Sequence, residues 1–147
     1  MKAPTKGIVV DGSTRGNPGP SQYRGIDLET GTILFNIDIG IATNNITEFL
    51  ALCHAILYCV NSNISTDIYS DSQTGLSWIK YRKVNSSLPI SPKTEKARDF
   101  VKRAETKLKD LEIKFDGIDL VVNNSINVCK WYSSEYGEIP ADYGFKK

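Results

Sequence analysis

Hydrophobic and polar positions divide the first third of the chain into short segments with the periodicity of β-strands. Residues 8–10 are an apolar, β-branched run, which predicts a buried strand ending at Asp11. Two further strands are predicted at 23–27 and 32–39, and the second alternates apolar with other residues. Because the turn-forming residues 29–31 separate these two segments, we expect three antiparallel strands in a meander.

Helical and strand patterns alternate after residue 40. The predicted elements are, in order, a helix at 46–60 capped by residues 43–45, a strand at 67–71, a helix at 72–80, a loop at 81–92, a helix at 97–111 and a strand at 126–131. Residues 111–122 are compatible with either a hairpin or an irregular insertion. A strand, a helix and a further strand in succession imply a right-handed crossover and a parallel pair, so the sequence predicts an α/β fold.

The composition is that of a globular protein, with 147 residues, 40% hydrophobic and 24% charged. We expect one domain over residues 1–147. No apolar run approaches the ~20 residues of a membrane span, and the first residues lack the apolar stretch of a secretory signal, so we expect a cytoplasmic protein. The three cysteines, Cys53, Cys59 and Cys129, lie in apolar-periodic segments and are expected to be reduced core residues.

The formal net charge of +1 conceals a local excess of basic residues. Residues 78–110 contain ten lysines and arginines and four acidic residues. This pattern is compatible with a positive face that binds nucleic acid or with an ordinary solvated helix surface.

Two carboxylates, Asp11 and Asp71, each end a predicted strand. Ligands gather at the carboxyl ends of neighbouring parallel strands, and carboxylates there are suited to a hard divalent cation. Glu48 lies at the edge of the apolar stripe, near the start of its helix. Each residue also has an ordinary interpretation, namely an Asp-Gly turn or a solvated helix-start acid. For His54, the only histidine, we expect a helix-surface or packing role rather than catalysis.

The order of four motifs narrows these interpretations. DGSTRGNPG begins at Asp11, TNNITE ends at Glu48, SDSQ contains Asp71, and the chain finishes with KWYSSEYGEIPADYG and a short tail. This combination resembles the type 1 ribonuclease H family (RNase HI-like), in particular a subgroup ending in a GEIPADFG-like segment. The resemblance implies an RNase H-like fold, with a mixed five-stranded sheet of three antiparallel strands followed by parallel strands, flanked by helices.

The resemblance also implies a set of catalytic, metal-binding carboxylates: Asp11, Glu48, Asp71 and, as the fourth, Asp142. Glu135 and Glu138 are the alternatives for the fourth acid. The implied cofactors are two Mg²⁺ ions, with Mn²⁺ as a possible substitute, bridged by Asp11. No histidine follows His54, so the sequence departs here from the better-known members, which carry one in the loop before the fourth acid.

The implied activity is endonucleolytic hydrolysis of the RNA strand of RNA/DNA hybrids, leaving 5′-phosphate and 3′-hydroxyl ends. The residues that match substrate-binding positions of the family are Asn17, Asn45 and Gln73, as readers of the 2′-hydroxyl, and Thr43, on a DNA phosphate. We expect a monomer whose partner is the hybrid. The alternatives are an inactive module that binds hybrids or double-stranded RNA, and a structural subunit of a larger nucleic-acid machine.

Overall fold

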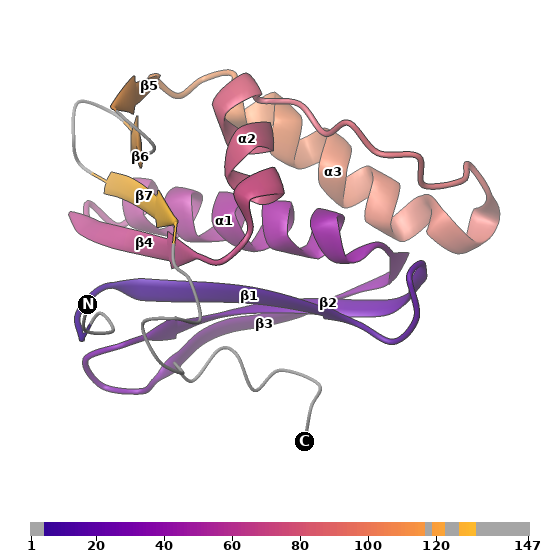
Figure 1. Ribbon diagram of the computed structural model, residues 1–147, viewed down its shortest axis with the longest axis horizontal. Coiled ribbons are helices and arrows are strands. Elements are labelled where there is room, and N and C mark those ends of the chain that lie inside the picture. The colour runs from indigo at the N-terminus through magenta and orange to yellow at the C-terminus, as the bar shows by residue number, and fades with distance from the viewer. Residues whose placement is uncertain (1–4, 117–118, 123–126, 132–147) are drawn as a thin grey trace.

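A mixed sheet with helices packed against it organises residues 5–116, 119–122 and 127–131, which are described by this computed structural model (Figure 1). Its elements are β1 (Ile8–Thr14), β2 (Gly19–Asp27), β3 (Ile33–Ala42), α1 (Asn44–Asn61), β4 (Thr66–Ser70), α2 (Gln73–Tyr81), a 3₁₀ turn (Pro92–Thr94), α3 (Glu95–Leu108), β5 (Ile113–Asp116), β6 (Asp119–Val122) and β7 (Asn127–Trp131). The strand order is β3-β2-β1-β4-β7-β6-β5. Strands β1 to β3 pair antiparallel and β1, β4 and β7 pair parallel, which confirms the predicted α/β class and its mixed sheet.

The first strand is longer than the hydrophobic pattern predicts. Its apolar residues are buried as expected, but β1 continues beyond Asp11 to Thr14 instead of ending at the carboxylate. The reason is its antiparallel partner, because β2 pairs with every residue of β1 and places Arg24 opposite Asp11. Pairing with a neighbouring strand therefore overrides the turn preference of the Gly-Ser pair that follows Asp11.

The number of strands also exceeds the predicted five. Within residues 111–122, the structure forms the hairpin alternative, with β5 and β6 paired antiparallel. Strand β6 pairs antiparallel with β7, so the hairpin adds two strands to the edge of the sheet. These strands have four residues each, and runs of that length carry too little periodicity to be distinguished from a loop.

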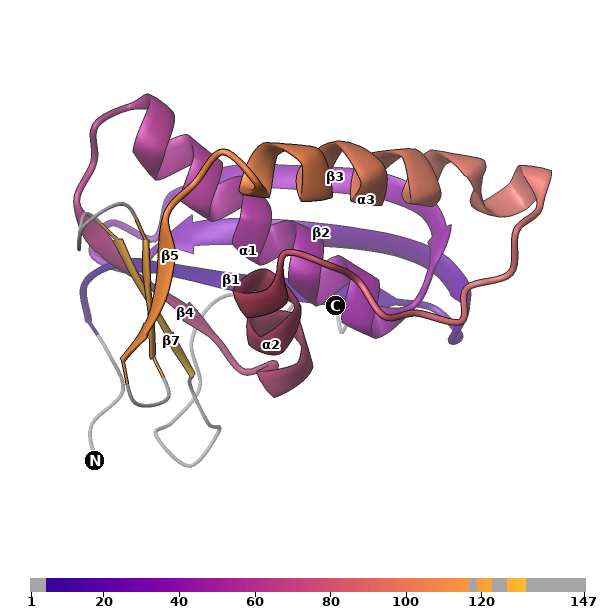
Figure 2. The same cartoon turned by 90° about the horizontal axis from the view of Figure 1, so that it is seen from above.

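Helix α1 is the centre of the core. Its N-cap residue, Thr43, accepts a hydrogen bond from the Ile46 amide at 3.4 Å, which fixes the helix start where the capping signal predicts it. Phe49 and Leu52 are completely buried. Helix α3 runs beside α1 over the same face of the sheet (Figure 2). Helix α2 packs against α1, where Trp78 meets Phe49 edge to face. No helix within the described ranges has both the length and the apolar character that crossing a membrane requires.

The predicted loop between α2 and α3 is held to the body of the protein by Arg82. This residue ends α2 with φ of 56°, and its guanidinium donates hydrogen bonds to the carbonyls of Leu108 and Leu111 at 3.2 and 2.9 Å. At the other end of the loop, Ser91 and Thr94 form a capping box before α3. Arg82 therefore belongs to the architecture rather than to a free basic surface.

Cys53 and Cys59 are free and buried, as the sequence predicts. Burial raises the pKa of the Cys53 thiol to about 12 and that of the Cys59 thiol to about 11. Both side chains therefore stay protonated at neutral pH and behave as small apolar core residues. The side chain of Cys129 lies outside the described part of the chain.

His54 has the packing role expected from the sequence. Its ring stacks on Phe35 with 3.9 Å between ring centroids, and its Nδ1 shares a hydrogen bond of 2.8 Å with the Tyr23 hydroxyl. Burial, and then the charge of Lys107, lower the pKa of His54 below its ordinary value of 6.5.

This lowered pKa predicts a pH dependence of stability. The unfolded chain takes up the His54 proton before the folded protein does, so the folded state loses stability as pH falls below 6.5. In the His54→Gln variant, this part of the pH dependence is expected to disappear. Urea unfolding of both proteins from about pH 8 to about pH 5.5 measures it. Equal slopes of the unfolding free energy against pH in the two proteins would contradict the assignment.

Candidate active site

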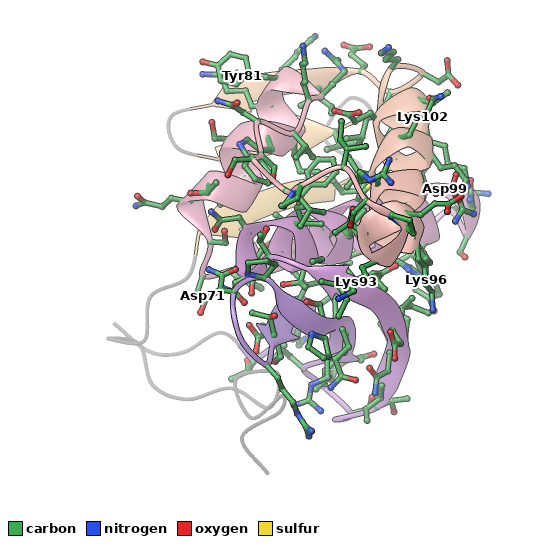
Figure 3. The ribbon with its side chains drawn as sticks, turned by 90° about the vertical axis from the view of Figure 1, so that its right-hand side faces the viewer. Asp71, Tyr81, Lys93, Lys96, Asp99 and Lys102 are labelled. Carbon is green, nitrogen blue, oxygen red and sulfur yellow. The ribbon has the colours of Figure 1, made fainter. Side chains whose placement is uncertain are left out.

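The register of the sheet aligns Asp11 with Asp71, where the neighbouring strands β1 and β4 run side by side. Strands β1 and β4 are parallel neighbours with Val9 opposite Tyr69, so continuing the register by two residues aligns the two carboxylates. Strand β4 ends at Ser70, and Asp71 follows it immediately, just before α2 (Figure 3). The expectation that these acids meet because their strands are neighbours is confirmed.

Glu48 reaches the same place from α1. The amide of Gly12 donates a hydrogen bond of 2.8 Å to its Oε1, and the side chain is only 3% exposed, so Glu48 is not a solvated helix-start acid. Residue 12 must be glycine for the helix to approach β1 this closely, because a Cβ there would overlap the side chain of Thr47. The contact between strand and helix thus sets the position of Glu48.

The three carboxylates form one compact cluster. Asp11, Glu48 and Asp71 each offer an oxygen atom, and these atoms lie within 4.8 Å of one another. Glu48 is buried, Asp11 is half-buried and Asp71 is exposed. The cluster therefore has a buried floor and is open to solvent on the side of Asp71.

The electrostatics of the cluster are unfavourable for three negative charges. Burial raises the pKa of Glu48 well above 4.5, and the charges of Asp11 and Asp71 raise it further. The hydrogen bond from Gly12 opposes this increase, whereas the closeness of the Asp11 side chain adds to it. Bringing the acids together therefore costs free energy unless a proton or a cation compensates their charge.

A hard divalent cation fits this donor set. Glu48 Oε1 is held by Gly12, while Oε2 is buried with no hydrogen-bond partner among the described residues. Carboxylate oxygens are the protein ligands that Mg²⁺ and Mn²⁺ prefer. A cation beside Oε2 would satisfy this atom and relieve the repulsion among the three acids.

The predicted substrate-binding residues surround the starts of two helices. Asn17, Asn45 and Gln73 are exposed, and Thr43 caps α1. The Oδ1 of Asn17 accepts a hydrogen bond of 3.1 Å from the Asn44 amide, so one end of this side chain has a capping role. Asn45 is one turn before Glu48, and Gln73 is two residues after Asp71, which places both near the cluster.

Two of the basic residues of 78–110, Lys96 and Lys102, lie away from the carboxylate cluster. In Figure 3, Lys96 and Lys102 of α3 lie on the right of the molecule, whereas Asp71 lies on its left. Lys96 also pairs with Asp38 at 3.9 Å. Asp142, the predicted fourth carboxylate, and its alternatives Glu135 and Glu138 lie outside the described residues, so the choice among them stays a prediction.

Two residues of the site, Gly12 and Thr47, are not among the candidates that the sequence suggests. The sequence predicts a turn at Gly12 that allows a close backbone approach, but it does not show that α1 is the element that approaches. Thr47 is a polar residue next to Glu48 within an apolar stripe, and that contrast was the available signal for it.

Comparison with solved structures finds, among the similar ones, three structures of two RNase H1 proteins. The RNase H1 of the halophilic archaeon Halobacterium salinarum NRC-1 is 25% identical, with a TM-score of 0.41, and 67% of this chain and 75% of that chain are covered. LC11-RNase H1, isolated from compost by a metagenomic approach, is 23% identical, with a TM-score of 0.49, and 89% of this chain and 86% of that chain are covered. A structure of LC11-RNase H1 in complex with an RNA/DNA hybrid gives 19% identity and a TM-score of 0.49. In this comparison, 92% of this chain and 89% of that chain are covered.

The family model described as RNase H matches residues 5–119, which is most of the chain. The matched part includes all three clustered carboxylates, Asp11, Glu48 and Asp71. The family and enzyme class expected from the sequence motifs are thus confirmed, and the chain belongs to the RNase H family as an enzyme of the ribonuclease H type.

Proposed function

We propose that this protein hydrolyses the RNA strand of RNA/DNA hybrids endonucleolytically, with two divalent cations, and leaves 5′-phosphate and 3′-hydroxyl ends. The observation that carries the proposal is the cluster of Asp11, Glu48 and Asp71, whose oxygens converge within 4.8 Å in a chain of the RNase H family. A domain that only bound nucleic acid would have no use for repulsive acids beside its substrate, which disfavours the inactive binding module.

Mg²⁺ is the proposed ion, with Mn²⁺ as a possible substitute, and the holding residues are Asp11, Glu48, Asp71 and the predicted Asp142. Bound cations of this kind stabilise the negative charge that develops on the attacking and leaving oxygens of a phosphodiester. The protein's own contribution is to fix the carboxylates before substrate arrives. Gly12 holds one oxygen of Glu48, and the open side of the cluster at Asp71 leaves room for a phosphate.

Recognition of the RNA strand is assigned to the exposed amides near the cluster. A 2′-hydroxyl is both donor and acceptor, and an amide can meet it with either atom. Asn45 and Gln73 are exposed with both amide atoms available in the described structure, whereas Asn17 uses Oδ1 to cap α1 and offers its NH₂ group. Thr43, at the same helix start, is proposed to contact a DNA phosphate. A monomer in the cytoplasm stays our prediction.

A cleavage assay tests the proposed function. End-labelled RNA/DNA hybrid, RNA duplex and DNA duplex are incubated with the protein, with and without Mg²⁺, and the products are separated on a gel. We expect cleavage of the hybrid's RNA strand alone and only with the cation, because the RNA strand must supply 2′-hydroxyls and the carboxylates need a counter-charge. Binding of the hybrid without cleavage in Mg²⁺ or Mn²⁺ would favour the inactive binding module.

A further inference from the structure

Thr47 is a completely buried polar residue beside a proposed ion ligand, and its position is determined on two sides. Its hydroxyl donates a hydrogen bond of 2.6 Å to the carbonyl of Asn44, in the first turn of α1. The same side chain occupies the space next to Gly12 that a Cβ at that position would need. Thr47 is thus held by the helix start and rests directly on β1.

Gly12, the partner of Thr47 in this contact, also holds Glu48. Gly12 touches Thr47 through its Cα and holds Glu48 Oε1 through its amide at 2.8 Å. If the helix shifts relative to β1 at Thr47, the hydrogen bond from Gly12 changes its length and angle, and the buried Oε2 of Glu48 changes its direction. Close-packed contacts transmit such shifts because they have no free volume to absorb them.

The contact also extends toward the surface. The amide of Asn44, whose carbonyl accepts the Thr47 bond, donates to Oδ1 of Asn17 in the loop after β1. A continuous set of contacts therefore joins the loop, the helix start and the carboxylate. Thr47 is the member that connects the backbone of α1 with that of β1.

We propose that Thr47 is a positioning residue, which sets the spacing between α1 and β1 at Gly12 and thereby aims Glu48 at the divalent cation. It touches neither ion nor substrate, and it acts only through Gly12 and Glu48. The inference rests on the proposed function for the identity of the ion. Supporting groups of this kind change metal affinity by about 10- to 100-fold when they are removed.

Three substitutions at Thr47 distinguish the contribution of its hydroxyl group from that of the size of its side chain. Thr47→Ser keeps a hydroxyl that can bond Asn44 and fill the space beside Gly12. Thr47→Val keeps the bulk but places a methyl group against the Asn44 carbonyl, where the present separation is 2.6 Å. Thr47→Ala leaves the space empty. Thr106→Ala is the matched control, because Thr106 makes the same kind of bond, 2.9 Å to the Lys102 carbonyl, on α3.

The measurement is Mg²⁺ and Mn²⁺ binding to the free, full-length protein by isothermal titration calorimetry, without nucleic acid and well below the melting temperature of each variant. We expect Thr47→Ser and Thr106→Ala to bind within about 3-fold of wild type, and Thr47→Val and Thr47→Ala to bind about 10-fold more weakly. If Thr47→Ala does not fold, the Ser and Val variants alone decide the outcome.

Equal metal affinity in wild type, Thr47→Ser and Thr47→Val would overturn the positioning role. A loss of affinity in Thr106→Ala as large as that in Thr47→Val would do the same, because it would reveal a general effect on helix stability.

The hybrid-cleavage assay separates the two proposals. A wild-type protein that binds the cation but cleaves no hybrid refutes the proposed function alone, whereas an active wild type with unchanged metal binding in Thr47→Val refutes the positioning role alone.

Discussion

Asp11→Asn is expected to abolish Mg²⁺-dependent cleavage of an RNA/DNA hybrid while leaving the binding of the hybrid intact. The substitution preserves the shape of the side chain and its place on β1 opposite Arg24. It removes one negative charge from a cluster whose oxygens converge within 4.8 Å. A cation held by fewer charges stabilises the developing charge of the reaction less well, and a loss of about 4 kcal/mol corresponds to about 10³-fold in rate.

Binding of the hybrid is expected to stay the same or to tighten slightly in this variant, since one repulsive carboxylate near the phosphates becomes neutral. Single-turnover cleavage and fluorescence anisotropy with labelled hybrid measure the two effects separately. Asp99→Asn is a suitable control, because Asp99 is an exposed acid on α3 that pairs with Arg103 at 3.0 Å, away from the cluster. Full activity of Asp11→Asn would remove Asp11 from the catalytic set.

Glu48→Gln is expected to stabilise the protein in the absence of metal while destroying its response to Mg²⁺. Burial and the charges of Asp11 and Asp71 raise the pKa of Glu48 above 4.5. A group with a raised pKa contributes its full stabilisation below its unfolded pKa and loses it as pH rises through the folded value. At neutral and higher pH, the metal-free wild type therefore carries a cost that glutamine does not have.

Glutamine can still accept the hydrogen bond from Gly12 through its amide oxygen, so the fold of the site is retained. Relief of only about 1 kcal/mol raises the melting temperature by about 3 °C in a domain of this size. Calorimetry at about pH 8 and about pH 5, with and without Mg²⁺, measures the effect. The advantage of the variant should shrink toward the lower pH, and Mg²⁺ should raise the melting temperature of the wild type much more than that of the variant.

An unchanged or lower melting temperature of metal-free Glu48→Gln at the higher pH would show that the three acids do not repel one another as the geometry implies. An equal Mg²⁺ response in both proteins would remove Glu48 from the ion-binding set. The two outcomes are independent, so the experiment separates the electrostatic cost of the cluster from its role in holding the cation.

Features that are encoded locally can be predicted from the sequence alone. Thr43 caps α1 where the pattern predicts it, and α2 begins within one residue of its predicted start, with Ser72 as its cap, because a capping hydroxyl needs only the amides of the next few residues. The identity of the three clustered acids can also be predicted from the sequence, because the motifs around Asp11, Glu48 and Asp71 resemble those of the type 1 ribonuclease H family. These signals are short-range, so they can be recognised without knowing which other segments each helix or strand contacts.

Features that depend on contacts between distant segments become visible in the folded protein. Strand β1 extends past Asp11 because β2 pairs with it, and β5 and β6 form strands because β6 pairs with the edge of β7 and β5 pairs with β6. The burial of Glu48, and the roles of Gly12 and Thr47 beside it, exist only where α1 meets β1. Pairing register and close packing are properties of two segments at once, so no single stretch of sequence carries them.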